Sequence, residues 1–201
     1  MKAVFFDLGE TLVDENRAWL VEAESAGMSP FLFFTVLGAL IERGEDHRQV
    51  WELFGIERKP FPVRFEPEDL YPDVLPCLDL LKSVGLRVGL AGNHSAGAAT
   101  ALVEAGLPVE VVGSSGEWGV EKPAPAFFER LAAEAGLAPA EIAYVGDRVD
   151  NDVVPARAAG MFSIFVRRGP WGVIQANWPG AADADAVVES LAEIPSLLGA
   201  A

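Results

Sequence analysis

Four stretches of the sequence place acids, an amide or a lysine where a strand of a buried sheet is expected to end. Their polar members are Asp7, Asn93, Lys122 and the group Asp147, Asp150, Asn151 and Asp152. Because ligands bind outside the carboxyl ends of parallel strands, these side chains are predicted to share one edge of the sheet. Carboxylates that meet there repel unless a cation lies between them, and hard oxygen ligands suit Mg²⁺. With Lys122 to balance a phosphoryl group and Asn93 to orient it, the set could transfer a phosphoryl group to a carboxylate.

The segment that leads into Asp7 is uniformly apolar. Val4, Phe5 and Phe6 run into the acid without polar alternation, and a glycine and a hydroxyl follow it closely. This pattern is typical of a central strand in a parallel sheet that is covered on both faces. An aspartate that merely caps a turn is the alternative interpretation.

From Pro72 onward, helical and strand patterns alternate. Further strands are predicted at 86–91, 109–112, 142–145, 162–166 and 186–188, with helices at 74–84, 95–105 and 123–135, another that ends at Gly160 and a short one near the C-terminus. Such alternation predicts an α/β fold, a Rossmann-like parallel sheet with helices on both faces. We expect residues 1–14 and 71–201 to form this core.

Residues 15–70 are predicted to form a small helical domain inserted into the core. Helices are expected at 17–26, 30–43 and 46–54, and the proline-containing segment 59–72 is expected to be a linker back to the core. The second helix is apolar nearly all round, so it must be buried within the insertion or against a second subunit.

Composition limits the partners. The chain has 201 residues, a formal net charge of −15 and 51% hydrophobic residues, which suits one sizeable buried core and disfavours nucleic acid and anionic membranes. The single cysteine, Cys77, excludes an intramolecular disulfide. No secretory signal is visible, and the apolar run 31–41 is well short of the ~18 residues that indicate a membrane span. We expect a soluble cytoplasmic protein, monomeric or homodimeric.

The arrangement of motifs resembles the haloacid dehalogenase-like (HAD) hydrolase superfamily over nearly the whole chain. Residues 5–12 (FFDLGETL) are similar to its first motif, 119–123 (GVEKP) to its third and 144–152 (YVGDRVDND) to its fourth, which AAGM at 158–161 follows. The insertion between the first and second motifs is similar to the family's helical cap, which closes over the substrate.

The resemblance implies a role for each motif residue. Asp7 would be the nucleophile and, with the Gly9 carbonyl and Asp147, would hold Mg²⁺, while Asp152 would support the metal directly or through water. Lys122 would steady the phosphoryl group. The remaining substrate contacts would come from Thr11 and Asn93. The implied function is a Mg²⁺-dependent phosphatase of a small phosphorylated metabolite that acts through an aspartyl-phosphate.

Two positions depart from the family pattern. Its phosphatases carry a second aspartate, a general acid and base, two residues after the nucleophile, where this chain has Gly9. Its second motif has serine or threonine before the asparagine, where this chain has Gly92. Loss of a general acid or base typically costs about 10² to 10⁴ in rate. The sequence offers four replacement acids, none of which it can place: Glu10, Asp14, His47 and His94.

Three alternative functions stay open. A catalytically impaired member that binds a phosphorylated ligand or a partner protein is favoured by the two glycines. Haloacid dehalogenation needs no metal, and the carboxylate of Asp147 beside the nucleophile argues against it. Phosphonate cleavage tolerates a small residue at position 9, but needs a cap lysine, for which the insertion offers only Lys59.

Overall fold

The computed structural model describes residues 1–57 and 65–199. Within them, six strands form one parallel sheet in the order β3-β2-β1-β4-β5-β6. The strands are β1 (Ala3–Phe6), β2 (Arg87–Gly92), β3 (Val111–Ser114), β4 (Ile142–Gly146), β5 (Phe162–Val166) and β6 (Ala186–Val188). The order reverses at β1, so the crevice outside its carboxyl end is the place where such a sheet binds ligands. The predicted Rossmann-like α/β fold is confirmed.

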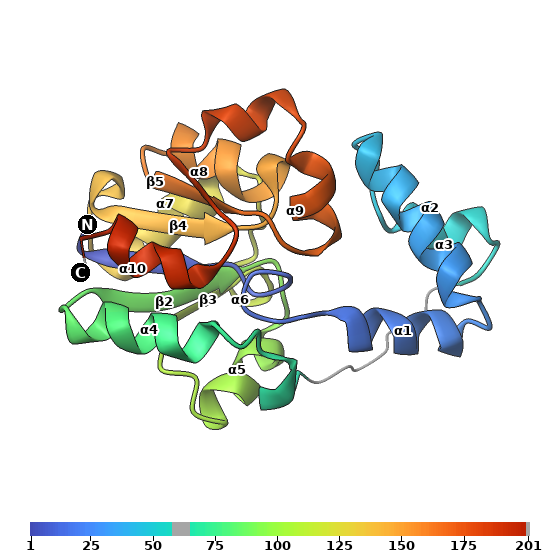
Figure 1. The fold of residues 1–201 in the computed structure, drawn as a ribbon, viewed down its shortest axis with the longest axis horizontal. Coiled ribbons are helices and arrows are strands. Elements are labelled where there is room, and N and C mark those ends of the chain that lie inside the picture. The colour runs from blue at the N-terminus through green and yellow to red at the C-terminus, as the bar shows by residue number, and fades with distance from the viewer. Residues whose placement is uncertain (58–64, 200–201) are drawn as a thin grey trace.

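Helices cover both faces of the sheet (Figure 1). One face packs against α4 (Val74–Ser83), α5 (Ala96–Glu104) and α10 (Ile194–Leu197), and the other against α7 (Pro125–Ala135) and α8 (Val154–Ala158). Strand β1 shows why its sequence lacks polar alternation. Val4 and Phe6 enter one core and Phe5 enters the other, and all three are buried.

The inserted segment forms α1 (Asn16–Ser25), α2 (Pro30–Glu42) and α3 (Gln49–Leu53), which stand to one side of the sheet in Figure 1. Their own small core includes Phe33 and Leu37, and it also takes in Trp171 from α9 (Gly169–Gln175) of the main core. Contacts between α2 and α9 therefore attach the segment to the core.

The chain leaves and re-enters the core at one place. Val13 forms an antiparallel bridge with Leu70, and the Asp14 N–H donates to the Asp69 carbonyl at 2.8 Å. Arg17, at the start of α1, also pairs with the Asp69 carboxylate. The two connections between the core and the helical segment are thus bonded to each other.

Several sequence-based boundaries differ from the structure. Helix α3 is shorter than 46–54, and of the predicted linker 59–72, residues 59–64 lie outside the described residues, as does Lys59. Helix α2 buries Phe33, Leu37, Leu40 and Ile41 within this single chain, whereas Phe31 is 83% exposed, so the predicted burial within the insertion holds for only part of the helix.

Strand β3 begins at Val111 rather than 109, because the Val109 N–H bonds to the Leu107 carbonyl instead of to β2. Helix α7 begins at Pro125 rather than Pro123, because Ala124 is still extended with ψ of 133°. The short helices α6 (Ser115–Trp118) and α9 were not predicted.

No single helix among the described residues is both long and apolar enough to cross a membrane. Helices α1 and α2 meet the length and composition criteria only when taken together, and they are bent by 114° at the break between them.

Candidate active site

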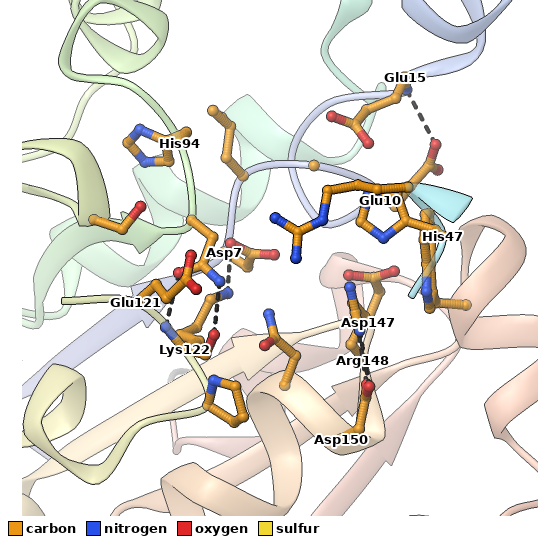
Figure 2. A pocket seen from close by; sticks show the side chains of 18 of the residues that line it. Asp7, Glu10, Glu15, His47, His94, Glu121, Lys122, Asp147, Arg148 and Asp150 are labelled. Carbon is orange, nitrogen blue, oxygen red and sulfur yellow. Dashed lines mark hydrogen bonds and ion pairs between the residues drawn. The ribbon is translucent and has the colours of Figure 1, made fainter. Parts of the chain in front are cut away.

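The predicted polar residues do meet at the carboxyl edge of the sheet (Figure 2). The Nζ of Lys122 lies 2.8 Å from Oδ1 of Asp7 and 2.6 Å from Oδ1 of Asp152. Burial lowers the pKa of Lys122, but Asp152 and Asp7 outweigh it and hold that pKa well above its usual value. The lysine is therefore a fixed positive charge at the base of the site.

Asn93 holds Lys122 in place through the backbone. The Lys122 N–H donates to Oδ1 of Asn93 at 2.8 Å, and Nδ2 of Asn93 donates to the Lys122 carbonyl at 2.9 Å. The amide thus links the end of β2 to the loop that carries the lysine, and its contact with a phosphoryl group stays a prediction.

Among the described residues, Asp7, Asp147 and Asp152 each offer an oxygen within 4.8 Å of the others. Oδ1 of Asp147 lies 3.5 Å from the Thr11 hydroxyl, and its buried Oδ2 has no hydrogen-bond partner among those residues. Burial, followed by the charges of Asp152 and Asp7, raises the pKa of Asp147 well above its usual value. A buried carboxylate oxygen without a donor, facing two further carboxylates, fits a divalent cation bound by oxygen ligands.

The neighbours of Asp147 divide into two groups. Asp152 points into the site, while Asp150 accepts hydrogen bonds from Arg148 at 2.8 Å and from Gln175 at 3.1 Å. Asp150 and Asp152 lie within a π-helical turn, Val149–Val153, and their side chains point in different directions. Only part of the acidic run that the sequence presents therefore faces the candidate cation site.

The loop after β1 turns sharply back on itself. Gly9 bridges Val13, and the Glu10 N–H donates to the Val13 carbonyl at 2.7 Å. Glu10 has φ of +53°, a conformation uncommon for a residue with a side chain, and its carboxylate is buried away from Asp7. Oε2 of Glu10 accepts from the Tyr71 hydroxyl at 2.7 Å and Oε1 accepts from the Glu15 N–H at 3.2 Å.

This turn brings the side chain of Glu15 back over Gly9. A Cβ built on Gly9 would lie 2.7 Å from both Cδ and Oε1 of Glu15, so the Glu15 carboxyl group occupies the space of a side chain at position 9. Burial in the pocket, with the charges of Glu10 and Asp7, raises the pKa of Glu15 to about 8. Sequence reasoning missed this residue, because the return of the loop from Gly9 to Val13 leaves no signal in the sequence.

The second departure, Gly92, has a steric explanation. A Cβ at this position would come closer than 3.0 Å to Oδ1 of Asp7, a distance that real Cβ atoms essentially never show. When Asp7 is paired with Lys122, its side chain therefore occupies the space that the Cβ of a serine or threonine at position 92 would need.

The structure also places the four residues that the sequence offered as replacement acids. Glu10 faces Tyr71, and Asp14 accepts from the Asn16 N–H at 2.9 Å. His47 lines the pocket with its ring 5.4 Å from that of Trp171. His94 also lines it, and burial lowers the pKa of its imidazole.

The carboxylates open into a cavity of about 780 Å³. The core contributes Asp7, Lys122 and Arg148 to its wall, and the helical segment contributes Trp19 and residues 44–48. The segment therefore lies over the carboxyl edge of the sheet, and the cavity is of a size that suits a small metabolite.

The structure is a doubly wound α/β sheet with a buried lysine and a carboxylate cluster at its carboxyl edge, a combination of charges that suits a cation and an anionic group. The profile of the haloacid dehalogenase-like hydrolases matches residues 1–160, so the chain belongs to that family of hydrolases. The resemblance found in the motifs is confirmed.

Curated relatives are phosphatases. A glyceraldehyde 3-phosphate phosphatase of Methanopyrus kandleri is 30% identical over 85% of this chain and 86% of its own length. A phosphoserine phosphatase of Thermus thermophilus is 36% identical over 74% of this chain and 59% of its own length.

Solved structures share the fold. A HAD phosphatase of Thermococcus onnurineus matches with a TM-score of 0.67 and 23% identity, over 100% of this chain and 99% of its own. The L-2-haloacid dehalogenase of Xanthobacter autotrophicus matches with a TM-score of 0.69 and 20% identity, over 98% of each chain.

Proposed function

We propose that this protein is a Mg²⁺-dependent phosphatase that hydrolyses the monoester of a small phosphorylated metabolite through an aspartyl-phosphate on Asp7. The observation that carries the proposal is the position of Lys122 between Asp7 and Asp152, together with Oδ2 of Asp147, which has no hydrogen-bond partner in the described part of the chain. A nucleophile, a fixed positive charge and a cation site are the parts that phosphoryl transfer to a carboxylate requires.

Each residue of the site has a separate task. An oxygen of Asp7 attacks phosphorus in line with the ester oxygen, and Lys122 balances the charge on the transferred group. Thr11 and Asn93 would contact the phosphoryl oxygens. Asp7, the Gly9 carbonyl, Asp147 and Asp152 would hold Mg²⁺, which supplies charge stabilisation at the phosphoryl oxygens.

The helical segment supports a small substrate. We propose that residues 15–70 form a cap over a core of residues 1–14 and 71–201, because residues of both parts line the same cavity. His47 and Arg48 from the helical segment and Arg148 from the core also line this cavity, Arg48 paired with Asp46 and Arg148 with Asp150. Relatives named for glyceraldehyde 3-phosphate, phosphoserine and phosphoglycolate act on metabolites of this size class.

Haloacid dehalogenation, in which the aspartate attacks carbon, is less compatible with this site than phosphate ester hydrolysis. A metal-free haloacid dehalogenase would leave the carboxylate of Asp147 buried beside Asp7 with no cation to compensate it, which is costly. The solved dehalogenases resemble this chain at a level of identity that speaks for the fold alone.

A panel of phosphate monoesters assayed with and without Mg²⁺ tests the proposal. We expect turnover of at least one small phosphorylated metabolite that requires the metal and is abolished by Asp7→Asn. Mg²⁺-dependent binding of these compounds without turnover would instead support a catalytically impaired binding protein. Turnover that survives Asp7→Asn would exclude an aspartyl-phosphate mechanism.

A further inference from the structure

An alkyl phosphate needs a proton on its departing oxygen, and water needs a base before it can attack the phosphorylated aspartate. Position 9 carries no side chain that could serve either step. A phosphatase that acts on alkyl phosphates at this site therefore needs another acid of the cavity for both steps.

Most carboxylates that line the cavity are already engaged. Glu10 binds the Tyr71 hydroxyl and the Glu15 N–H. Asp46 pairs with Arg48 at 2.7 Å, and Asp150 pairs with Arg148 at 2.8 Å. Oxygens of Asp147 and Asp152 face the cation site.

Glu15 differs from all of these in both position and partners. It lines the cavity with Asp7 and Gly9, and no lysine or arginine of the described residues forms an ion pair with it. Its Cδ and both carboxylate oxygens lie within 2.9 Å of the point where a Cβ on Gly9 would be. In Figure 2 it lies above the loop of Asp7, while Lys122 and Asp147 lie below that loop.

The backbone explains why this position is fixed. The bridge between Gly9 and Val13 closes the loop, and the Glu15 N–H is held by Oε1 of Glu10. Glu15 is also the residue that precedes α1, and its carbonyl accepts the Trp19 N–H at 2.9 Å. The side chain therefore projects over position 9 from a backbone that is fixed on both sides.

We propose that Glu15 is the general acid and base of the reaction and replaces the side chain that is missing at position 9. This inference rests on the proposed phosphatase activity. In the first step, an oxygen of Asp7 bonds to phosphorus, the bond from phosphorus to the ester oxygen breaks, and the Glu15 carboxyl group gives its proton to that oxygen, so an alcohol leaves.

In the second step, the Glu15 carboxylate takes a proton from a water molecule as the water oxygen attacks phosphorus. The bond from phosphorus to the Asp7 oxygen breaks, inorganic phosphate leaves, and both carboxyl groups return to their starting states. Each proton that Glu15 gives in the first step is recovered in the second, so no further reactant is needed.

The test compares leaving groups in the full-length protein with Mg²⁺. Glu15→Gln should lower kcat/KM for an alkyl phosphate such as glycerol phosphate by about 10² to 10⁴. With 4-nitrophenyl phosphate, whose leaving group needs no proton, the same variant should release about one nitrophenolate per active site in a rapid burst and then turn over slowly. Glu24→Gln, which changes an exposed acid on α1, should behave like the parent.

A rescue variant separates chemistry from folding. Gly9 does not have positive φ, so an L residue is tolerated there once the Glu15 carboxyl group is removed. Glu15→Ala should lose alkyl phosphatase activity, and adding Gly9→Asp to it should restore at least tenfold. Gly9→Asp alone should gain little, because its side chain must displace Glu15.

Two results would overturn the assignment. One is an alkyl phosphate rate that Glu15→Gln leaves unchanged, and the other is a loss of equal size in the alkyl rate and in the burst rate. If the parent fails to hydrolyse any phosphate, or if Asp7→Asn stays active, the proposed function itself is wrong. A parent that needs Asp7 but not Glu15 refutes the inference alone.

Discussion

The Nζ of Lys122 lies 2.6 Å from Oδ1 of Asp152, and both side chains are completely buried. Oδ1 of Asp7 lies 2.8 Å from the same ammonium group, and the centroid of the Tyr144 ring lies 5.5 Å from it. Charges removed from water to this degree are tolerated only when they are paired with good geometry. Lys122 is therefore part of the fold as well as of the proposed phosphoryl site.

Replacement of Lys122 by methionine should show both roles. Lys122→Met keeps the length of the side chain but leaves two acids without a cation, so we expect the free energy of unfolding to fall by about 3–5 kcal/mol. Mg²⁺ should restore part of the loss, because it binds the same carboxylates. Urea unfolding with and without the metal measures both effects. Lys82→Met, at an exposed site on α4, is the control, and equal losses in the two variants would contradict the argument.

Asp147→Asn should weaken Mg²⁺ binding by at least the 10- to 100-fold that loss of a metal's supporting group typically costs. The reason is the buried Oδ2 of Asp147, which has no donor among the described residues. Asp150→Asn is the matched control from the same loop, because Asp150 faces Arg148 and Gln175 instead. Calorimetric titration gives both affinities, and an unchanged value for Asp147→Asn would remove this acid from the cation site.

Sequence patterns predicted the core well because its strands are buried on both faces. Val4 to Phe6 and the segment 142–145 are continuous apolar runs, a pattern that only a covered parallel sheet accommodates. The errors lie where local turns override propensity. The sequence predicted a helix that starts at Pro123, but Ala124 is extended and the helix begins at Pro125. Helix α9 was missed because a Gly-Pro-Trp-Gly start resembles a loop.

The polar residues at the sheet edge could be predicted because each follows a strand, and parallel strands end together. The position of Glu15 could not, since it depends on the bridge between Gly9 and Val13 and on positive φ at Glu10, a residue type that gives no such signal. The orientation of the Glu10 side chain was equally hidden. Glu10 looked available from the sequence, and only the structure shows it bound to Tyr71.

Tyr71→Phe should destabilise the loop that positions Glu15. The Tyr71 hydroxyl satisfies a buried oxygen of Glu10 at 2.7 Å, and leaving such an acceptor unpaired costs about 1–3 kcal/mol. Burial already raises the pKa of Glu10 despite this hydrogen bond, so the variant should raise it further. Thermal unfolding of Tyr71→Phe, Glu10→Gln and the double variant gives the coupling energy, and strictly additive losses would show that the two groups do not interact.

The last prediction concerns Asp73, which joins three separate parts of the core. Oδ2 accepts from the Ser190 hydroxyl at 2.6 Å and the Leu191 N–H at 2.9 Å, and Oδ1 accepts from Nη1 of Arg168 at 3.1 Å. Burial raises the pKa of Asp73, but the hydrogen bonds from Arg168 and Ser190 outweigh it and lower that pKa below its usual value. The folded state thus favours the ionised form.

The sign of the pH dependence follows from this shift. An acid whose folded pKa lies below its unfolded value of about 3.9 contributes stability that is complete above that pH and disappears as the pH falls through the folded pKa. Asp73→Asn should therefore lower the free energy of unfolding by about 1.5–3 kcal/mol at pH 7, since it weakens hydrogen bonds to a charged group. The difference from the parent should shrink steadily below about pH 4.

Urea unfolding at a series of pH values measures this difference in stability. Asp79→Asn, which changes an exposed acid on α4, is the control for the loss of a carboxylate as such. A difference that stays constant down to pH 3 would mean that the charge of Asp73 contributes nothing to the fold.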